Sequence, residues 1–168
     1  YKTVAGVFSE TKIDIGSSQL VPHLDALKGD VADLGAGWGY LSREILTHEG
    51  VTRLDMIEAD KAALDCAVIN TNDARARPVW TDALTFSGGP YDIVVSNPPF
   101  HTTRAGDPDL GKGFIATAAR ILKPRGALLM VANRHLPYET ELGAKFARVE
   151  ELAGTGAFKI FRATRPKR

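Results

Sequence analysis

The run Ser96-Asn97-Pro98-Pro99-Phe100 places hydrogen-bond acceptors beside an aromatic ring, directly after an apolar stretch over 93–95. Two consecutive prolines fix the backbone and remove two N–H donors, so carbonyl acceptors remain. Together with the carboxamide oxygen of Asn97, these acceptors can hold both hydrogens of a planar amine or amide. Phe100 can stack on the flat face of such a group, which contributes roughly 1–3 kcal/mol per base. The alternative is a rigid turn with Phe100 in the core, but the end of a central strand is a typical ligand position.

A glycine-rich turn, Asp33-Leu-Gly35-Ala36-Gly37-Trp-Gly39, follows another apolar stretch and precedes a helical pattern. Glycines allow the backbone to approach a ligand closely. A dinucleotide fingerprint requires a further glycine where this chain has Tyr40, so the turn favours a nucleoside over a pyrophosphate. The alternative is a tight structural turn without a ligand.

Acidic residues follow the next two strand-like stretches. Glu58 stands where an acidic residue characteristically binds both ribose hydroxyls, and the glycine turn favours this role. The alternative is an exposed acid at the strand end or a cap of the following helix. Asp82-Ala83 can meet the amino group and ring edge of adenine, although Asp is also common in turns. These positions therefore predict an adenosine site that spans three strand ends.

The elements that must position these residues alternate along the chain. Apolar runs predict strands at 31–34, 54–57, 79–80, 93–95 and 127–132, and helical patterns cover 40–48, 60–70, 109–121 and 137–145. Two last strands joined at 154–156 must be antiparallel because a parallel crossover needs a dozen or more residues. We therefore expect an α/β fold with a mostly parallel seven-stranded sheet, helices on both faces and a terminal hairpin. Asp60 is the expected N-cap of its helix, and ligands should bind beyond the carboxyl ends of the strands.

Composition narrows the classes further. The 168 residues are 44% hydrophobic and 24% charged with a net charge of +1, which excludes a disordered, fibrous or disulfide-rich chain. No apolar run is long enough to span a bilayer, which predicts no membrane association, and a single Cys66 suits the cytoplasm. We expect one domain over 1–168, in which 29–168 form the core and 1–28 pack near the ligand mouth. Leu20, Leu24 and Leu27 follow a helical spacing typical of core residues.

The last stretch, from Lys159 to Arg168, carries five basic residues and no acid. Such a segment can hold the phosphate backbone of a nucleic acid. The alternative is a solvated terminus that binds nothing.

The two central motifs resemble those of class I S-adenosylmethionine-dependent methyltransferases that modify planar nitrogens. More closely, the chain resembles the catalytic domain of the ribosomal RNA small-subunit methyltransferase C family, which methylates the exocyclic amine of guanine. The resemblance runs in order through nearly the whole chain, and the Asn-Pro-Pro-Phe-His run is its most selective part. The residues that carry it are Gly6–Ser9, Asp14–Ser17, Gln19, Asn97–His101, Val131–Asn133, Leu136–Tyr138 and Phe158–Arg162.

This resemblance implies a Rossmann-like fold and S-adenosylmethionine as the cofactor, with S-adenosylhomocysteine as the product. Ribosomal RNA or the small ribosomal subunit is the implied partner, in a cytoplasmic process of rRNA methylation. Bacterial members resemble a fused pair, so an amino-terminal domain absent here is a further expected partner. The implied catalytic residues are Asn97, Pro98, Pro99 and Phe100. The implied cofactor contacts are Asp33, Gly35, Ala36, Gly37, Glu58, Ala59, Asp82, Ala83, Asn97, Phe8 and Gln19, and the implied RNA contacts are His101, Arg104, Arg134, Tyr138 and Lys159.

The expected chemistry is direct transfer of a methyl group to an amine whose hydrogens are held by Asn97 and the Pro98 carbonyl. Alignment of the two reactants can supply about 7–11 kcal/mol, so no metal and no strong base are expected. A guanine in folded RNA would first have to be unstacked. Three alternatives remain at this point: a glutamine amide or DNA adenine as substrate, a silent binding module, and a nicotinamide oxidoreductase, which Tyr40 disfavours.

Overall fold

The computed structural model describes residues 1–99 and 108–168. Its helices and strands follow one another much as the sequence predicts. The helices are α1 (Ile15–Leu20), the 3-10 helix η1 (Val21–His23), α2 (Tyr40–Leu46), α3 (Lys61–Thr71), α4 (Pro108–Ile121) and α5 (Tyr138–Lys145). The strands are β1 (Gly29–Leu34), β2 (Val51–Glu58), β3 (Ala76–Trp80), β4 (Tyr91–Ser96), β5 (Leu122–Asn133), β6 (Phe146–Gly154) and β7 (Phe158–Pro166).

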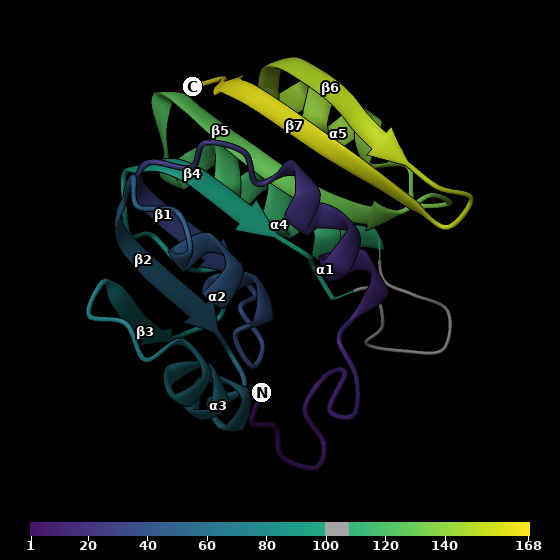
Figure 1. The fold of residues 1–168 in the computed structure, drawn as a ribbon. Helices are drawn as coiled ribbons and strands as arrows, with labels where there is room; N and C mark the ends of the chain where they lie inside the picture. Colours follow the sequence, from purple (N-terminus) through teal and green to yellow (C-terminus); the bar gives the residue numbers. More distant parts are fainter. Residues whose placement is uncertain (100–107) are drawn as a thin grey trace.

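All of these strands form a seven-stranded sheet in the order β3-β2-β1-β4-β5-β7-β6. The first five are parallel, and β7 runs antiparallel to both β5 and β6. The strand order reverses between β1 and β4, which lie side by side in the centre (Figure 1). The predicted Rossmann-like sheet with a terminal antiparallel hairpin is therefore confirmed.

Helices cover both faces of the sheet (Figure 1). On one face, side chains of α1, α2 and α3 such as Leu20, Ile45 and Leu64 pack with apolar residues of the central strands. On the other face, α4 and α5 do the same through residues such as Ile115 and Leu142. Continuous apolar strands are what a sheet buried on both sides requires. Within the described residues, no helix is both long and apolar enough to cross a membrane.

Local signals in the sequence explain where several elements begin. Asp60 caps α3, because its side chain accepts hydrogen bonds from the backbone N–H groups of Ala62 and Ala63 at 2.8 and 3.3 Å. The predicted core residues Leu20, Leu24 and Leu27 are buried. Strand β5 begins earlier than the sequence predicted, at Leu122, and its pairing with β4 is irregular before Ala127.

The last stretch of the chain differs from the basic tail considered above. It forms strand β7 through Pro166, and the backbone N–H of Lys167 still donates to the carbonyl of Lys145 at 2.8 Å. Sheet pairing with β5 and β6 on its two sides fixes this stretch in place. Lys159, Arg162 and Arg165 are therefore part of the sheet, and Lys167 and Arg168 follow directly after its last strand.

Candidate functional site

The glycine turn joins the end of β1 to the start of α2 and is fastened to the end of β2. The backbone N–H groups of Gly35 and Ala36 donate to the carbonyl of Ile57 at 2.9 and 3.0 Å. Gly39 has a φ of +91°, and a Cβ there would lie 2.8 Å from Cα of Ala67 in α3, so the position requires glycine. At Gly37, in contrast, a Cβ would meet nothing within 4 Å, because this part of the turn faces a cleft.

Glu58, at the end of β2, binds the turn with its carboxylate. Oε2 accepts from the backbone N–H of Gly37 at 2.8 Å, and Oε1 accepts from the backbone N–H of Asp60 at 2.8 Å. Glu58 does not cap α3, since Asp60 does that. Each carboxylate oxygen keeps a further acceptor site, and Glu58 lines the cleft together with Ala59. The geometry thus leaves Glu58 able to accept hydrogen bonds from a diol.

Asp82 and Ala83 form another wall of the cleft, after β3. The Asp82 carboxylate accepts from the backbone N–H of Leu84 at 2.8 Å and so stabilises its own turn. Ala83 is buried and lies with Ile57 and Phe114 in the lining. This combination provides a flat apolar wall with one polar rim, as a purine ring requires.

Asn97 lies at the centre of the cleft, next to the glycine turn. The Ser96 hydroxyl donates to the carbonyl of Leu34 at 2.7 Å and ties the end of β4 to the end of β1. The Asn97 Nδ2 group donates to Oδ2 of Asp14 at 2.7 Å and to Oγ of Ser17 at 2.8 Å. Its Oδ1 is buried and has no hydrogen-bond partner within the described part of the chain. A buried acceptor without a partner is costly, and a role in binding or catalysis is one explanation for such an atom.

The prolines that follow Asn97 differ in exposure: Pro98 is buried, whereas Pro99 is exposed and lines the cleft. Phe100, His101 and Arg104 lie outside the described residues. The structure therefore places three of the four predicted catalytic residues at the carboxyl end of β4.

Asp33 is fully buried beneath the glycine turn. Its Oδ2 accepts from the Ser42 hydroxyl at 2.6 Å, and its Oδ1 has no partner among the described residues. Burial raises the pKa of Asp33 to about 7, and the nearby Glu58 carboxylate adds to the rise, against the lowering effect of Ser42. Asp33 does not line the cleft. The predicted direct contact between Asp33 and a cofactor is therefore not supported by its position.

The amino-terminal segment forms one side of the cleft. Phe8 is 59% exposed, lines the cleft, and its carbonyl accepts from Nε1 of Trp38 at 3.0 Å. Gln19, in contrast, points to the β6–β7 turn, where its Oε1 accepts from Thr155 Oγ1 at 3.5 Å. The structure thus brings Phe8 to the cleft and leaves Gln19 out of its lining, so the cofactor contact predicted for Gln19 is corrected.

Two predicted RNA contacts are wrong because the side chains are buried. Tyr138 is fully buried in the core beside α4, where a Cβ on Gly111 would collide with its ring. Lys159 is 4% exposed, and its Nζ donates to the Leu136 carbonyl at 2.9 Å and to Glu139. Neither side chain can meet an RNA at the surface.

Arg134 is half-exposed and binds the turn of the terminal hairpin. Its Nη2 donates to Glu151 at 2.8 Å and to the carbonyl of Phe158 at 3.2 Å. These bonds occupy several of the N–H donors of the guanidinium, so the main observed role of Arg134 is to stabilise the hairpin. A role in RNA contact stays a prediction.

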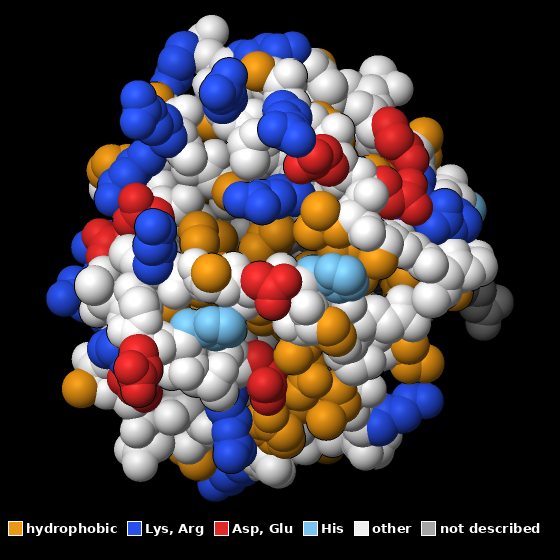
Figure 2. Space-filling view, turned by 45° about the horizontal axis from the view of Figure 1, so that its top comes forward, with side chains coloured by type: hydrophobic (Ala, Val, Ile, Leu, Met, Phe, Trp, Pro, Cys, Tyr) orange, Lys and Arg blue, Asp and Glu red, His pale blue; other side chains and the backbone are white. Residues whose placement is uncertain are grey.

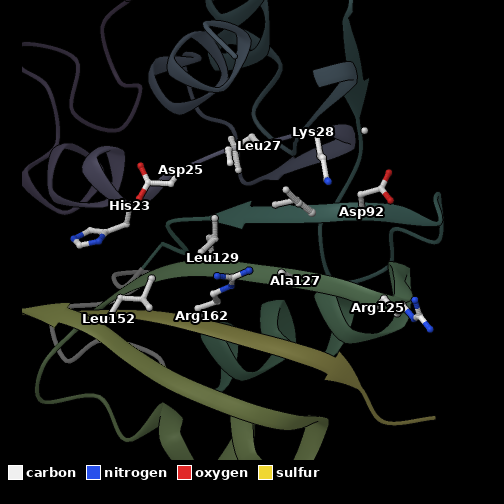
Figure 3. Close-up of a pocket in the computed structure, with 13 residues that line it drawn as sticks. His23, Asp25, Leu27, Lys28, Asp92, Arg125, Ala127, Leu129, Leu152 and Arg162 are labelled. Atoms are coloured by element: carbon white, nitrogen blue, oxygen red, sulfur yellow. The ribbon is translucent and has the colours of Figure 1, made fainter. Parts of the chain in front are cut away.

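The cleft at the carboxyl ends of the strands, here called the carboxyl-end cleft, consists of two adjoining hollows of about 50 and 230 Å³ that share Phe8, Gly35, Gly37 and Asn97. A larger cavity of about 790 Å³, the amino-end cavity, lies near the start of β1, β4 and β5. Figure 3 shows His23 and Asp25 on one side of it and Leu152 and Arg162 on the other. Figure 2 shows Lys and Arg side chains gathered over the upper part of this view, around hydrophobic side chains.

No group of three or more His, Cys, Asp or Glu side chains is placed to hold a metal ion in the described residues. The polar groups that converge on the carboxyl-end cleft are carboxylates, amides and backbone N–H groups. Sequence reasoning gave no role to Asp14 and Ser17, which the structure brings to Asn97. The one signal in the sequence that could have indicated them is the Asp14–Ser17 motif, which forms part of the family resemblance.

Comparison with known proteins decides the family. The profile of the family described as "Methyltransferase small domain" matches residues 1–162. The chain belongs to this family. Among curated relatives, the ribosomal RNA small subunit methyltransferase C of Shewanella sp. (strain MR-4) is 33% identical over 160 residues, and that of Shewanella denitrificans is 34% identical. The alignments cover 94% of this chain and 47% and 46% of the relatives, so the chain spans about half their length.

Solved structures of other methyltransferases share the fold of this member of the methyltransferase small domain family. A T. thermophilus 16S rRNA N2 G1207 methyltransferase, solved in complex with AdoMet and guanosine, superposes with a TM-score of 0.84 at 29% identity over 97% of this chain and 46% of that chain. A SAM-dependent O-methyltransferase from Thermotoga maritima gives 0.72 at 17% identity, over 94% of this chain and 68% of that one, and shows the fold alone. The resemblance read from the sequence motifs is confirmed.

Proposed function

We propose that this chain is an S-adenosylmethionine-dependent N-methyltransferase that modifies the exocyclic amine of a guanine in small-subunit ribosomal RNA. The observation that carries the proposal is the buried Oδ1 of Asn97, which has no partner in the described residues and lies beside the glycine turn. Relatives named for methylation of this RNA, and a solved relative with AdoMet and guanosine, support it. We propose that this reaction takes place in the cytoplasm. Because the chain spans about half the length of its curated relatives, we also propose a further domain as an additional partner.

The residues present fit the cofactor. Glu58 has free acceptor sites for the ribose hydroxyls, and Gly37 leaves room for the ligand at the turn. Ala83, Ile57 and Phe114 offer an apolar wall for adenine, with Asp82 at its rim. Bound there, S-adenosylmethionine would supply a reactive methyl group.

The chain's own residues would orient the acceptor. Asn97 Oδ1 and the Pro98 carbonyl can each accept one hydrogen of the amine, which directs the nitrogen lone pair away from both. Acceptors fixed in this way act most strongly when the nitrogen becomes positively charged, because they need no reorganisation at that moment. The proton then becomes acidic and can leave to water, so no strong base is required before the attack.

The test is transfer of labelled methyl groups from S-adenosylmethionine to 16S rRNA, both free and within small subunits, followed by mapping of the modified base. Duplex DNA and a glutamine-bearing protein are offered in parallel. We expect N2-methylguanine in the RNA only. Label on adenine in DNA or on a glutamine amide would contradict the guanine assignment, and binding of S-adenosylmethionine without any transfer would make the chain a silent module.

A further inference from the structure

The carboxamide of Asn97 is held by two residues from the other end of the sequence. Asp14 Oδ2 and Ser17 Oγ accept hydrogen bonds from its Nδ2 at 2.7 and 2.8 Å, across 83 and 80 residues of chain. Asp14 is itself fixed, because the same Oδ2 accepts from the backbone N–H of Ser17 at 2.7 Å as the N-cap of α1. Asp14 and Ser17 therefore hold the Asn97 amide in a fixed position.

These contacts fix the orientation of the carboxamide, with Nδ2 toward Asp14 and Ser17 and Oδ1 away from them. An amide has a donor side and an acceptor side, and a half-turn about its last bond exchanges them. After such a turn, Oδ1 would face the Asp14 carboxylate, which has no proton to donate when ionised. The Ser17 hydroxyl could adapt by donating, but Asp14 could not. Asp14 thus excludes the orientation in which Nδ2 would point at the substrate.

The same contact strengthens Oδ1 as an acceptor. A carboxylate on the N–H side polarises the amide, and hydrogen bonds in a chain reinforce one another in a site of low dielectric. Oδ1 is buried and unpaired in the described structure, so it gains fully from this polarisation. The gain is largest when the amine nitrogen becomes positive.

We propose that Asp14 and Ser17 are the positioning residues of Asn97, which fix its flip state and polarise its oxygen for the target amine. The inference rests on the proposed function and extends it to residues that act through Asn97. Both act on the transfer step and leave the affinity for S-adenosylmethionine unchanged.

The experiment compares Ser17→Ala with Ser18→Ala. The two changes remove the same atom from neighbouring positions of α1, but the Ser18 hydroxyl is exposed and donates only to the carbonyl of Ile15 at 2.8 Å. We expect kcat to fall about tenfold in Ser17→Ala and to stay unchanged in Ser18→Ala, with equal KM for S-adenosylmethionine. Asp14→Asn keeps the N-cap but removes the charge, and should lower kcat about 10–100-fold, as losses of orienting groups do at metal sites.

A double-mutant cycle separates positioning from a merely structural role. In an Asn97→Ala background, Ser17→Ala should change kcat no further, because the group it positions is gone. Equal rate losses in both backgrounds, or a loss seen only in KM for S-adenosylmethionine, would overturn the proposal.

A second readout keeps this result independent of the substrate. Side-chain NMR of Asn97 should show slowly exchanging Nδ2 protons that lose protection in Ser17→Ala and not in Ser18→Ala. If the wild-type chain transfers no methyl group to RNA but the protection pattern holds, the proposed function fails while the positioning contact stands. If the protons exchange at the same rate in all variants, the positioning proposal itself is wrong.

Discussion

The two ends of the central strands carry hollows of opposite character. The carboxyl-end cleft is small, and its walls are joined by hydrogen bonds between segments that are far apart in the sequence. Asn97 in its lining and Asp33 beneath the glycine turn each have a buried side-chain oxygen without a partner in the described residues. The amino-end cavity has nearly three times the volume of the cleft. Its basic side chains Lys28, Arg125 and Arg162 are exposed and form no ion pair within the described chain. Our choice of the carboxyl-end cleft as the proposed reaction site therefore rests on its convergent polar groups and not on its volume.

Burial of the ionised Asp33 carboxylate should lower the stability of the fold, and Asp33→Asn tests this because it removes the ionisable group. Folded Asp33 keeps its proton up to its raised pKa of about 7, whereas in the unfolded chain it loses the proton near its ordinary pKa of 3.8. Between these values the folded state binds more protons, so the free energy of unfolding falls as pH rises. A shift of this size corresponds to roughly 4 kcal/mol at 1.36 kcal/mol per unit. Denaturant titrations from pH 4 to 8 should show this decline in wild type and a flatter profile in Asp33→Asn, and parallel profiles would contradict the assignment.

Asn97→Ala tests the reacting side of the cleft. Losing one preorganised group of this kind typically lowers kcat 10²–10³-fold, about 2.7–4 kcal/mol. Affinity for S-adenosylmethionine should stay within a few-fold, as measured by calorimetry. Leu152→Ala, in the amino-end cavity, is the matched change and should leave kcat intact. If the Asn97→Ala variant reacts at a near wild-type rate, or if it does not fold, the Asn-Pro-Pro motif is a structural turn without a catalytic role.

Glu58→Gln tests the cofactor side. It removes the charge that we expect on the ribose hydroxyls, and one hydrogen bond to a charged group contributes about 1.5–3 kcal/mol. The Kd for S-adenosylmethionine should therefore rise about ten- to a hundredfold, with Glu150→Gln on β6 as the control. Unchanged affinity in calorimetry would remove Glu58 from the ribose site.

Lys159→Met tests whether the buried lysine belongs to the fold. Its charged Nζ loses two hydrogen bonds, at about 1.5–3 kcal/mol each. Methionine offsets part of this loss because it buries no charge, and Glu139 is exposed enough to return to water. We expect the free energy of unfolding to fall by about 1–2 kcal/mol, while the salt dependence of RNA binding stays the same. A flatter salt dependence with unchanged stability would restore Lys159 as an RNA contact.

The smallest effect is expected at the amino-end cavity. If RNA extends there, Arg125→Ala and Arg162→Ala should each flatten the log-log salt slope of RNA binding by about 0.7–0.9 and leave kcat unchanged. Gel-shift titrations at several salt concentrations measure this slope. Unchanged slopes in both variants would confine RNA to the carboxyl end of the sheet.

Local and periodic signals predicted most of the fold. The spacing of Leu20, Leu24 and Leu27 and the cap at Asp60 depend on neighbours within a few residues, and both predictions are confirmed. The sequence also predicted that Gly35 and Asn97 each follow a strand, and the structure places both after strand ends. Errors arose where burial depends on distant partners. Lys159 can be buried because its Nζ donates to Glu139, 20 residues earlier, and to the Leu136 carbonyl. No local sequence pattern indicates these partners.

The contact between Asp14 and Asn97 could not be predicted from the sequence, because it too joins residues that are distant along the chain. Its two residues are 83 positions apart and belong to segments with different periodicities. Gln19 shows the converse error, because it lies on the same helix as Ser17 but faces the hairpin turn. Which way a helical side chain points near a cleft depends on how the helix docks, and that requires the whole sheet.

The docked amino-terminal segment has a consequence for the order of folding. It supplies Phe8, Asp14 and Ser17 to the cleft, and its contact with Asn97 closes a long loop of chain. Closing such a loop costs entropy before the contacts repay it, so the cleft should be completed late, after β1 and β4 have paired. The newly made sheet would then exist for a time without a working site. A ligand that binds the finished cleft would select molecules in which the first residues are docked, and would protect that segment from proteases.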